Sequence, residues 1–152
     1  MNIIPGDFSD PRVRALLEYH LRGMHANTPA GHVFALDGSG LQKPDISFWV
    51  GWEGERPVVM GALKELGDGT GEIKSMRVAD GEAGKGHGKA MLKHIMDEAK
   101  RRGYRRLSLE TGSGVSFEPA IALYNAHGFR SGGKFADYEK SDFNQFFHLD
   151  IF

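Results

Sequence analysis

The sequence predicts a single-domain α+β fold in which most strands pair in an antiparallel sheet. Three observations support this prediction. The chain has 152 residues, a length that suits one domain with a single core. Short apolar runs typical of strands are interspersed with longer stretches of helical periodicity, without an internal repeat. Three of the expected strands follow one another with only short turns between them, which indicates an antiparallel meander.

Caps and periodicity define the N-terminal elements. Residues 2–4 can form a short first strand. Asp10 followed by Pro11 is typical of a helix cap and a first helical residue, and the apolar stripe that follows should end near Asn27–Thr28–Pro29. Residues 29–45 are rich in Gly, Pro and Asp, so we expect a long loop there with room for a short helix.

The remaining elements are apolar runs bounded by turns. The helix after the glycine-rich segment should end at Lys100–Arg101–Arg102–Gly103, because cations and glycine are favoured at a helix C-terminus. Residues 136–145 read as a polar link. The expected ranges are strands at 46–52, 57–63, 72–78 and 104–110, a helix at 117–127, and a closing strand pair of 129–135 with 146–152.

Composition restricts the classes of function. A formal net charge of −1 with interspersed charges argues against nucleic acid or a membrane surface as a partner, and no apolar stretch approaches the length of a membrane span. The absence of cysteine excludes a thiolate nucleophile and fits a reducing compartment, so we expect a cytoplasmic protein. The seven histidines show no H-E-x-x-H or comparable spacing, so no metal is expected.

Three alternate glycines between a predicted strand and a predicted helix form the most informative segment. Gly84, Gly86 and Gly88 lack a Cβ, so backbone amides can approach an anion, and the following helix adds the positive end of its dipole. A Walker A loop is excluded because Ala83 and Ala90 occupy its required glycine and hydroxyl positions. The spacing also differs from the dinucleotide fingerprint. We expect a phosphate-bearing cofactor here; a flexible turn without a ligand is the alternative.

The order of elements and two motifs resemble the GNAT superfamily of acetyl-coenzyme A-dependent N-acetyltransferases over nearly the whole chain. The family's cofactor signature is Gln or Arg-x-x-Gly-x-Gly or Ala, and Gly86 and Gly88 match its two small positions. Ala83 occupies the first position, where Lys85 or Lys89 could supply the missing charge. The resemblance implies the GNAT fold: a mixed, mostly antiparallel sheet of about six to seven strands, splayed at the cofactor site, with helices on both faces.

The second motif is the segment 117–129, which looks like the family's Ala-x-x-Leu-Tyr-x-x-x-Gly-Phe helix. Within the superfamily, the runs 19–21, 35–37, 44–49 and 72–78 resemble a bacterial branch typified by YsnE-like acetyltransferases. The resemblance implies that the glycine-loop amides bind the pyrophosphate of acetyl-coenzyme A and that the preceding strand binds its pantetheine arm. The expected cofactor-binding residues are Met76, Arg77, Val78, Gly84, Lys85, Gly86, His87, Gly88, Lys89 and Asn125.

Two residues are the leading catalytic candidates by the same resemblance. Tyr124 would protonate the leaving thiolate, although its helical stripe also allows a packing role. Glu72 would assist deprotonation of the amine, and Glu110 is the second choice for this base. Strand alternation should place Glu72, Lys74 and Met76 on one face, and an ion pair of Glu72 with Lys74 is the alternative to catalysis.

The acceptor is expected to be a small-molecule amine, because the chain shows neither an acidic groove nor a basic face. Candidate contacts are His20, His25, Trp49 and Glu110, with Trp52 nearby. Two alternatives from other classes stay open: a catalytically silent acyl-coenzyme A sensor, and an interaction module. The second would form a homodimer through aromatic side chains of the closing strands, namely Phe143, Phe146, Phe147 and Phe152.

Overall fold

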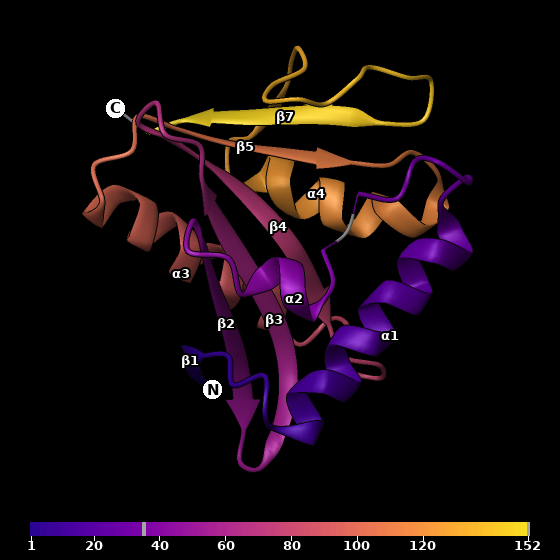
Figure 1. The fold of residues 1–152 in the computed structure, drawn as a ribbon, viewed down its shortest axis with the longest axis vertical. Coiled ribbons are helices and arrows are strands. Elements are labelled where there is room, and N and C mark those ends of the chain that lie inside the picture. Colours follow the sequence, from indigo (N-terminus) through magenta and orange to yellow (C-terminus); the bar gives the residue numbers. More distant parts are fainter. Residues whose placement is uncertain (35, 152) are drawn as a thin grey trace.

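A seven-stranded mixed sheet organises residues 1–34 and 36–151, the parts of the chain that the computed structural model describes (Figure 1). Its strand order is β1-β2-β3-β4-β5-β7-β6; β4 and β5 run parallel, and the other neighbours pair antiparallel. The expected mixed, mostly antiparallel sheet is therefore confirmed. The strands are β1 (Asn2–Pro5), β2 (Ile46–Glu53), β3 (Arg56–Glu65), β4 (Thr70–Val78), β5 (Arg106–Thr111), β6 (Arg130–Ser131) and β7 (Gln145–Asp150).

Helices cover both faces of this sheet. On one face α1 (Pro11–Asn27) and α2 (Gly38–Leu41) bury a core with β2 and β3, and on the other α3 (His87–Arg101) and α4 (Glu118–Ala126) bury a larger one. The period of two along a strand divides side chains between these cores: Val59 of β3 belongs to the α3 side and Met60 to the α1 side. Among the described residues, no helix is long and apolar enough to cross a bilayer.

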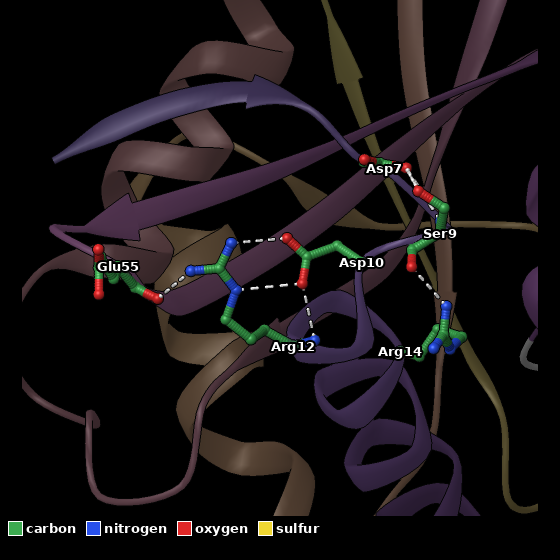
Figure 2. Close-up of polar contacts among 6 residues, drawn as sticks. All are labelled: Asp7, Ser9, Asp10, Arg12, Arg14 and Glu55. Carbon is green, nitrogen blue, oxygen red and sulfur yellow. Dashed lines mark hydrogen bonds and ion pairs between the residues drawn. The ribbon is translucent and has the colours of Figure 1, made fainter.

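The N-terminus of α1 is tied to the β2–β3 turn by the contacts drawn in Figure 2. Asp10 caps the helix by accepting from the backbone N–H of Arg12 at 2.9 Å. The guanidinium of Arg12 donates to both carboxylate oxygens of Asp10 and to the carbonyl of Glu55 at 2.9 Å. The predicted cap is therefore confirmed, and it fixes where α1 lies over the sheet.

A β-bulge at Ser75 interrupts β4. The register with β3 shifts so that Lys74 lies opposite Ala62 but Arg77 lies opposite Met60, which leaves one extra residue on β4. Ser75 has φ 57°, a left-handed conformation that is uncommon for a residue other than glycine. The extra residue reverses the side-chain alternation for the rest of the strand.

This reversal corrects the expectation that Glu72, Lys74 and Met76 share a face. Ile73, before the bulge, and Met76, after it, both pack into the core on the α3 side. Arg77 instead turns towards α1, where it bonds to His20. The side of β4 that faces α1 therefore carries Glu72, Lys74 and Arg77.

Three expected strands are shorter than predicted. The strand expected over 146–152 is Gln145–Asp150 within the described residues. The strand expected over 129–135 is only the two residues of β6; just beyond it the N–H of Gly132 still donates to the Phe146 carbonyl, and Nε2 of His148 donates to the carbonyl of Gly133 at 2.7 Å. The strand expected from Tyr104 begins at Arg106, because the N–H of Tyr104 closes the end of α3 by bonding to the Ala99 carbonyl.

The closing aromatic side chains do not form an exposed surface. Phe146 and Phe147 are each 3 % exposed, and Phe143 packs edge-on against Phe117 with ring centroids 5.6 Å apart. Phe152 lies outside the described residues. The proposed aromatic dimer surface is therefore wrong for Phe146 and Phe147, because their side chains are buried inside the fold.

We expect Asp10→Ala to lower the melting temperature by about 2–4 °C, the usual effect of losing an N-cap in a chain of this size. Hydrogen bonds from Arg12 lower the pKa of Asp10, so the carboxylate stabilises the fold above the ordinary aspartate pKa and this contribution is lost as pH falls below it. Calorimetry at several pH values measures both effects. Asp7→Ala, which removes a carboxylate bonded only to Ser9, is the control; equal melting of the two variants would contradict the prediction.

Candidate functional site

The site lies where β4 and β5 separate. These two strands pair only from Thr70 with Arg106 to Glu72 with Ser108, and beyond that point they diverge (Figure 1). A cavity of about 640 Å³ occupies the resulting wedge, lined by both strands, the glycine loop, the N-terminus of α3, α4 and α1. The predicted splay is therefore present. A larger depression of about 990 Å³ lies at the other end of β5, and its lining does not include the glycine loop.

The glycine loop presents unpaired backbone amides to the cavity. Gly84 and Gly86 have φ of 79° and 85°, which favours glycine over residues with a Cβ. Gly86 is the N-cap of α3 and offers no side-chain cap, so the amides of His87, Gly88 and Lys89 have no partner within the helix. Free amides at a positive helix end suit a phosphate group, and these residues all line the cavity.

Glu82 supports this loop from beneath. Its side chain is 2 % exposed and contacts Arg56 of β3, Lys85 at 3.0 Å and His87 at 3.3 Å. The bond from Lys85, helped by the charges of Arg56 and Lys85, lowers the pKa of the Glu82 carboxyl. Lys85 is therefore turned towards Glu82 and does not line the cavity, whereas Lys89 does.

Tyr124 reaches the cavity from α4. Its side chain is 6 % exposed, packs beside Phe129 with ring centroids 5.7 Å apart, and lines the wedge. Burial raises the pKa of the phenol to about 12, so the hydroxyl keeps its proton throughout the physiological range. The neighbouring Asn125 is exposed and does not line the cavity.

A buried polar cluster joins Glu72 and Lys74 of β4 to Tyr138. The Tyr138 hydroxyl donates to Glu72 Oε2 at 2.5 Å, and Lys74 Nζ donates to the same oxygen at 3.2 Å and to the tyrosine oxygen at 2.7 Å. Burial, together with the negative charge of Glu72, raises the pKa of Tyr138. Sequence reasoning missed Tyr138, because it lies in the polar link 136–145, where no periodicity indicates which side chain folds inward.

Glu110 also lines the cavity, whose other carboxyl groups are Glu72, Glu82 and the exposed Asp80. Burial raises its pKa to about 7, an effect that the charge of Lys74 opposes and the charge of Glu72 reinforces. Glu110 lines the same cavity as Glu72 and Tyr138. Glu72 is thus a carboxylate engaged by two donors, and Glu110 is a carboxyl group whose pKa lies near neutrality.

Of the other predicted acceptor contacts, only His20 reaches the cavity. It is 4 % exposed, and its Nδ1 accepts a bond from Arg77 Nε at 3.0 Å. Burial, with the charge of Arg77, lowers its pKa to about 3, so the imidazole is neutral. His25 is exposed and lies outside the lining, and Trp49 packs edge-on against His94 in the α3-side core at 4.9 Å between centroids.

The arrangement matches a known family. The family model described as "Acetyltransferase (GNAT) family" matches residues 13–129, which span the wedge, the glycine loop and Tyr124. The chain belongs to this family. Membership confirms the predicted enzyme class and the GNAT fold.

Curated relatives extend this match over most of the chain. The N-acetyltransferase YsnE of Bacillus subtilis is 46 % identical over 138 residues, 91 % of each chain. The N-acetyltransferase YedL of Escherichia coli is 41 % identical over 145 residues, 95 % of this chain and 91 % of YedL. The expected resemblance to YsnE-like acetyltransferases is therefore confirmed.

A solved structure shows the same fold at low identity. The structure of a Bacillus subtilis acetyltransferase in complex with CoA superposes with a TM-score of 0.73 at 18 % identity, covering 99 % of both chains.

Proposed function

We propose that the protein transfers an acetyl group from acetyl-coenzyme A directly to the primary amine of a small molecule. The observation that carries the proposal is one cavity whose lining joins the uncapped N-terminus of α3 to Glu72, Glu110 and the protonated Tyr124. The fold shared with an acetyltransferase in complex with CoA supports the choice of cofactor. Acetyl-coenzyme A, when bound, supplies an activated acyl group, so the protein needs no nucleophile of its own.

The cofactor would be held mainly by backbone groups. The loop amides at residues 84–88 suit the pyrophosphate, and Lys89 at the cavity adds a positive charge. On β4, Met76–Val78 lies beyond the last pair with β5, so its backbone groups on that side are free to bond to the pantetheine arm. Lys85 supports the loop through Glu82, and the exposed Asn125 would contact the cofactor only outside the wedge.

Glu110 is better suited than Glu72 to accept the amine proton. A general base works best when its pKa lies near the operating pH, and the pKa of Glu110 is about 7. Glu72 Oε2 already accepts from Tyr138 and Lys74, so this oxygen has little capacity left for a substrate proton. We therefore assign deprotonation to Glu110 and the positioning of Lys74 and Tyr138 to Glu72, which exchanges the order of preference taken from the sequence.

Tyr124 would assist departure of the sulfur. Its pKa of about 12 exceeds the value of about 8.5 of an ordinary thiol, so complete proton transfer from the phenol is unfavourable. A hydrogen bond from the phenol to the developing negative charge needs no such transfer and stabilises the transition state. Tyr124 then acts as a hydrogen-bond donor to the sulfur, which leaves as a thiolate and takes its proton from solvent.

We expect Gly86→Val to weaken the binding of acetyl-coenzyme A by at least about tenfold, because valine disfavours the left-handed backbone that aims the loop amides. Titration calorimetry measures the dissociation constant. Gly103→Val is the matched control: Gly103 has φ 77°, its Cβ would also meet no neighbour, and it lies at the opposite end of α3. Equal affinity in the two variants would contradict a cofactor role for the loop.

We expect the rate advantage of the wild type over Glu110→Gln to grow as pH rises through about 7 and to level at roughly 10²–10⁴-fold. Below this pH Glu110 is protonated and cannot act as a base. The ratio cancels titration of the amine itself, and kcat/KM comes from thiol release, which is free of background because the chain has no cysteine. Glu72→Gln should lower the rate but keep this pH dependence; the reverse pattern would make Glu72 the base.

We expect Tyr124→Phe to lower kcat by about 10–100-fold while KM for acetyl-coenzyme A changes little, because only the transition state gains from the phenol. Steady-state kinetics on an accepted amine measure this split. Tyr104→Phe is the control, since its buried hydroxyl lies outside the wedge and is unpaired among the described residues. Unchanged kcat in Tyr124→Phe would leave Tyr124 a packing residue.

A further inference from the structure

We propose that Arg77 binds a carboxylate of the acceptor, so the preferred substrates are amines that also carry a carboxylate group, as amino acids do. This inference rests on the proposed acetyl transfer and adds the substrate class. It uses the side chain of Arg77, whereas the cofactor role proposed for this residue uses only its backbone.

The bulge at Ser75 places the Arg77 side chain on the side of β4 that faces α1. Met76 and Val78, on either side of it, pack towards the α3-side core. Arg77 points the other way, to α1, where its guanidinium lies beside Gly23 and 5.8 Å from the ring centre of Tyr19. A Cβ at Gly23 would come within 3.2 Å of Nη2, so glycine at this point in α1 makes room for the guanidinium.

Arg77 is a partly buried cation without a protein anion. Its bond to the protein runs from Nε to the neutral His20, and no carboxylate among residues 1–34 and 36–151 forms an ion pair with it. A buried charge is costly unless it is paired. The two terminal nitrogens have no hydrogen-bond acceptor in the described part of the chain, and they form the planar fork that suits a carboxylate.

Two other cations line the cavity: Lys89, which is exposed at the glycine loop, and Lys74, which is already neutralised. Lys74 is bonded to Glu72 and Tyr138, so it has less to offer an incoming anion. The phosphates of the cofactor have their own binding groups at the N-terminus of α3. Arg77 is therefore a partly buried cation of the wedge without a counter-charge among the described residues, and the carboxylate of an acceptor can supply it while the amine lies near Glu110.

Side chains around Arg77 indicate what else the acceptor carries. Tyr19, Met24 and Phe34 line the same cavity as Arg77, and Phe34 packs edge-on against Tyr138 with centroids 5.4 Å apart. An apolar or aromatic side chain on the acceptor would fit against them. We therefore expect apolar amino acids to be preferred over charged ones.

The kinetic test compares each standard L-amino acid with its carboxamide in the wild type, Arg77→Gln and Arg22→Gln. Arg22 is an exposed arginine of α1 outside the cavity lining, so its replacement removes the same charge and serves as the control. We expect the wild type to favour the acid, and Arg77→Gln to raise KM for the acid by about 10–100-fold, with the carboxamide and kcat little changed. Arg77→Lys should be intermediate, because it keeps the charge but not the fork.

A binding test separates this inference from the proposed reaction. N-acetyl-L-amino acids and their N-acetyl amides are titrated into coenzyme A-loaded protein, with circular dichroism to confirm that each variant is folded. Tighter binding of acids than amides in the wild type, lost in Arg77→Gln but not in Arg22→Gln, supports the carboxylate site even if no amine is turned over. The inference is overturned if turnover or binding does not depend on the carboxylate, or if no acid binds. It is also overturned if the preference for acids survives Arg77→Gln. Weaker coenzyme A binding by Arg77→Gln alone would assign Arg77 to the cofactor instead.

Discussion

The separation of β4 from β5 is the constraint on which the rest of the structure depends. Parallel pairing ends at Glu72 and Ser108, so backbone groups inside the sheet are left without strand partners. Such groups are costly in a closed core but useful along a cavity, where a ligand can satisfy them. The helices complete this arrangement: α3 begins at one end of the wedge, α4 supplies Tyr124, and α1 closes the other side. The cavity is therefore a product of strand geometry, and the side chains adapt it to a particular chemistry.

The charged groups in the wedge affect the pKa values of their neighbours. Lys74 neutralises the Glu72 carboxylate by donating to its Oε2, and the Tyr138 hydroxyl donates a hydrogen bond to the same oxygen. For Glu110 the effect of burial, which disfavours the charged form, is the largest, and it raises the pKa. Arg77 bonds to His20, whose pKa is lowered by burial and by the charge of Arg77, so the imidazole is neutral. In the functions proposed above, the paired Glu72–Lys74–Tyr138 cluster corresponds to positioning, Glu110 to deprotonation, and the partly buried Arg77 to acceptor binding.

Features controlled by local chemistry could be predicted from the sequence, and those controlled by tertiary contacts could not. Asp10 and Pro11 begin α1 by capping, and the left-handed glycines 84 and 86 belong to the loop that the sequence indicated. The bulge could not be foreseen, because its left-handed residue is Ser75 and not glycine. Trp49 looked like a ligand contact, but its position on β2 directs it into the α3-side core. Tyr138 folds inward from a link without periodicity, where only the completed cavity provides its partners.

The single extra residue at Ser75 also bears on how such a protein can diversify. Side chains of β4 alternate between the two sides of the sheet both before and after the bulge. Before it, odd-numbered residues such as Ile73 face the α3-side core; after it, even-numbered residues such as Met76 do. Replacements at 72, 74 and 77 therefore alter the part of the cavity that faces α1, while the backbone of β4 that faces β5 keeps its shape. If these three side chains contact the acceptor as proposed, acceptor recognition can change without altering the backbone groups proposed to bind the acyl donor. One strand would then serve two separable purposes.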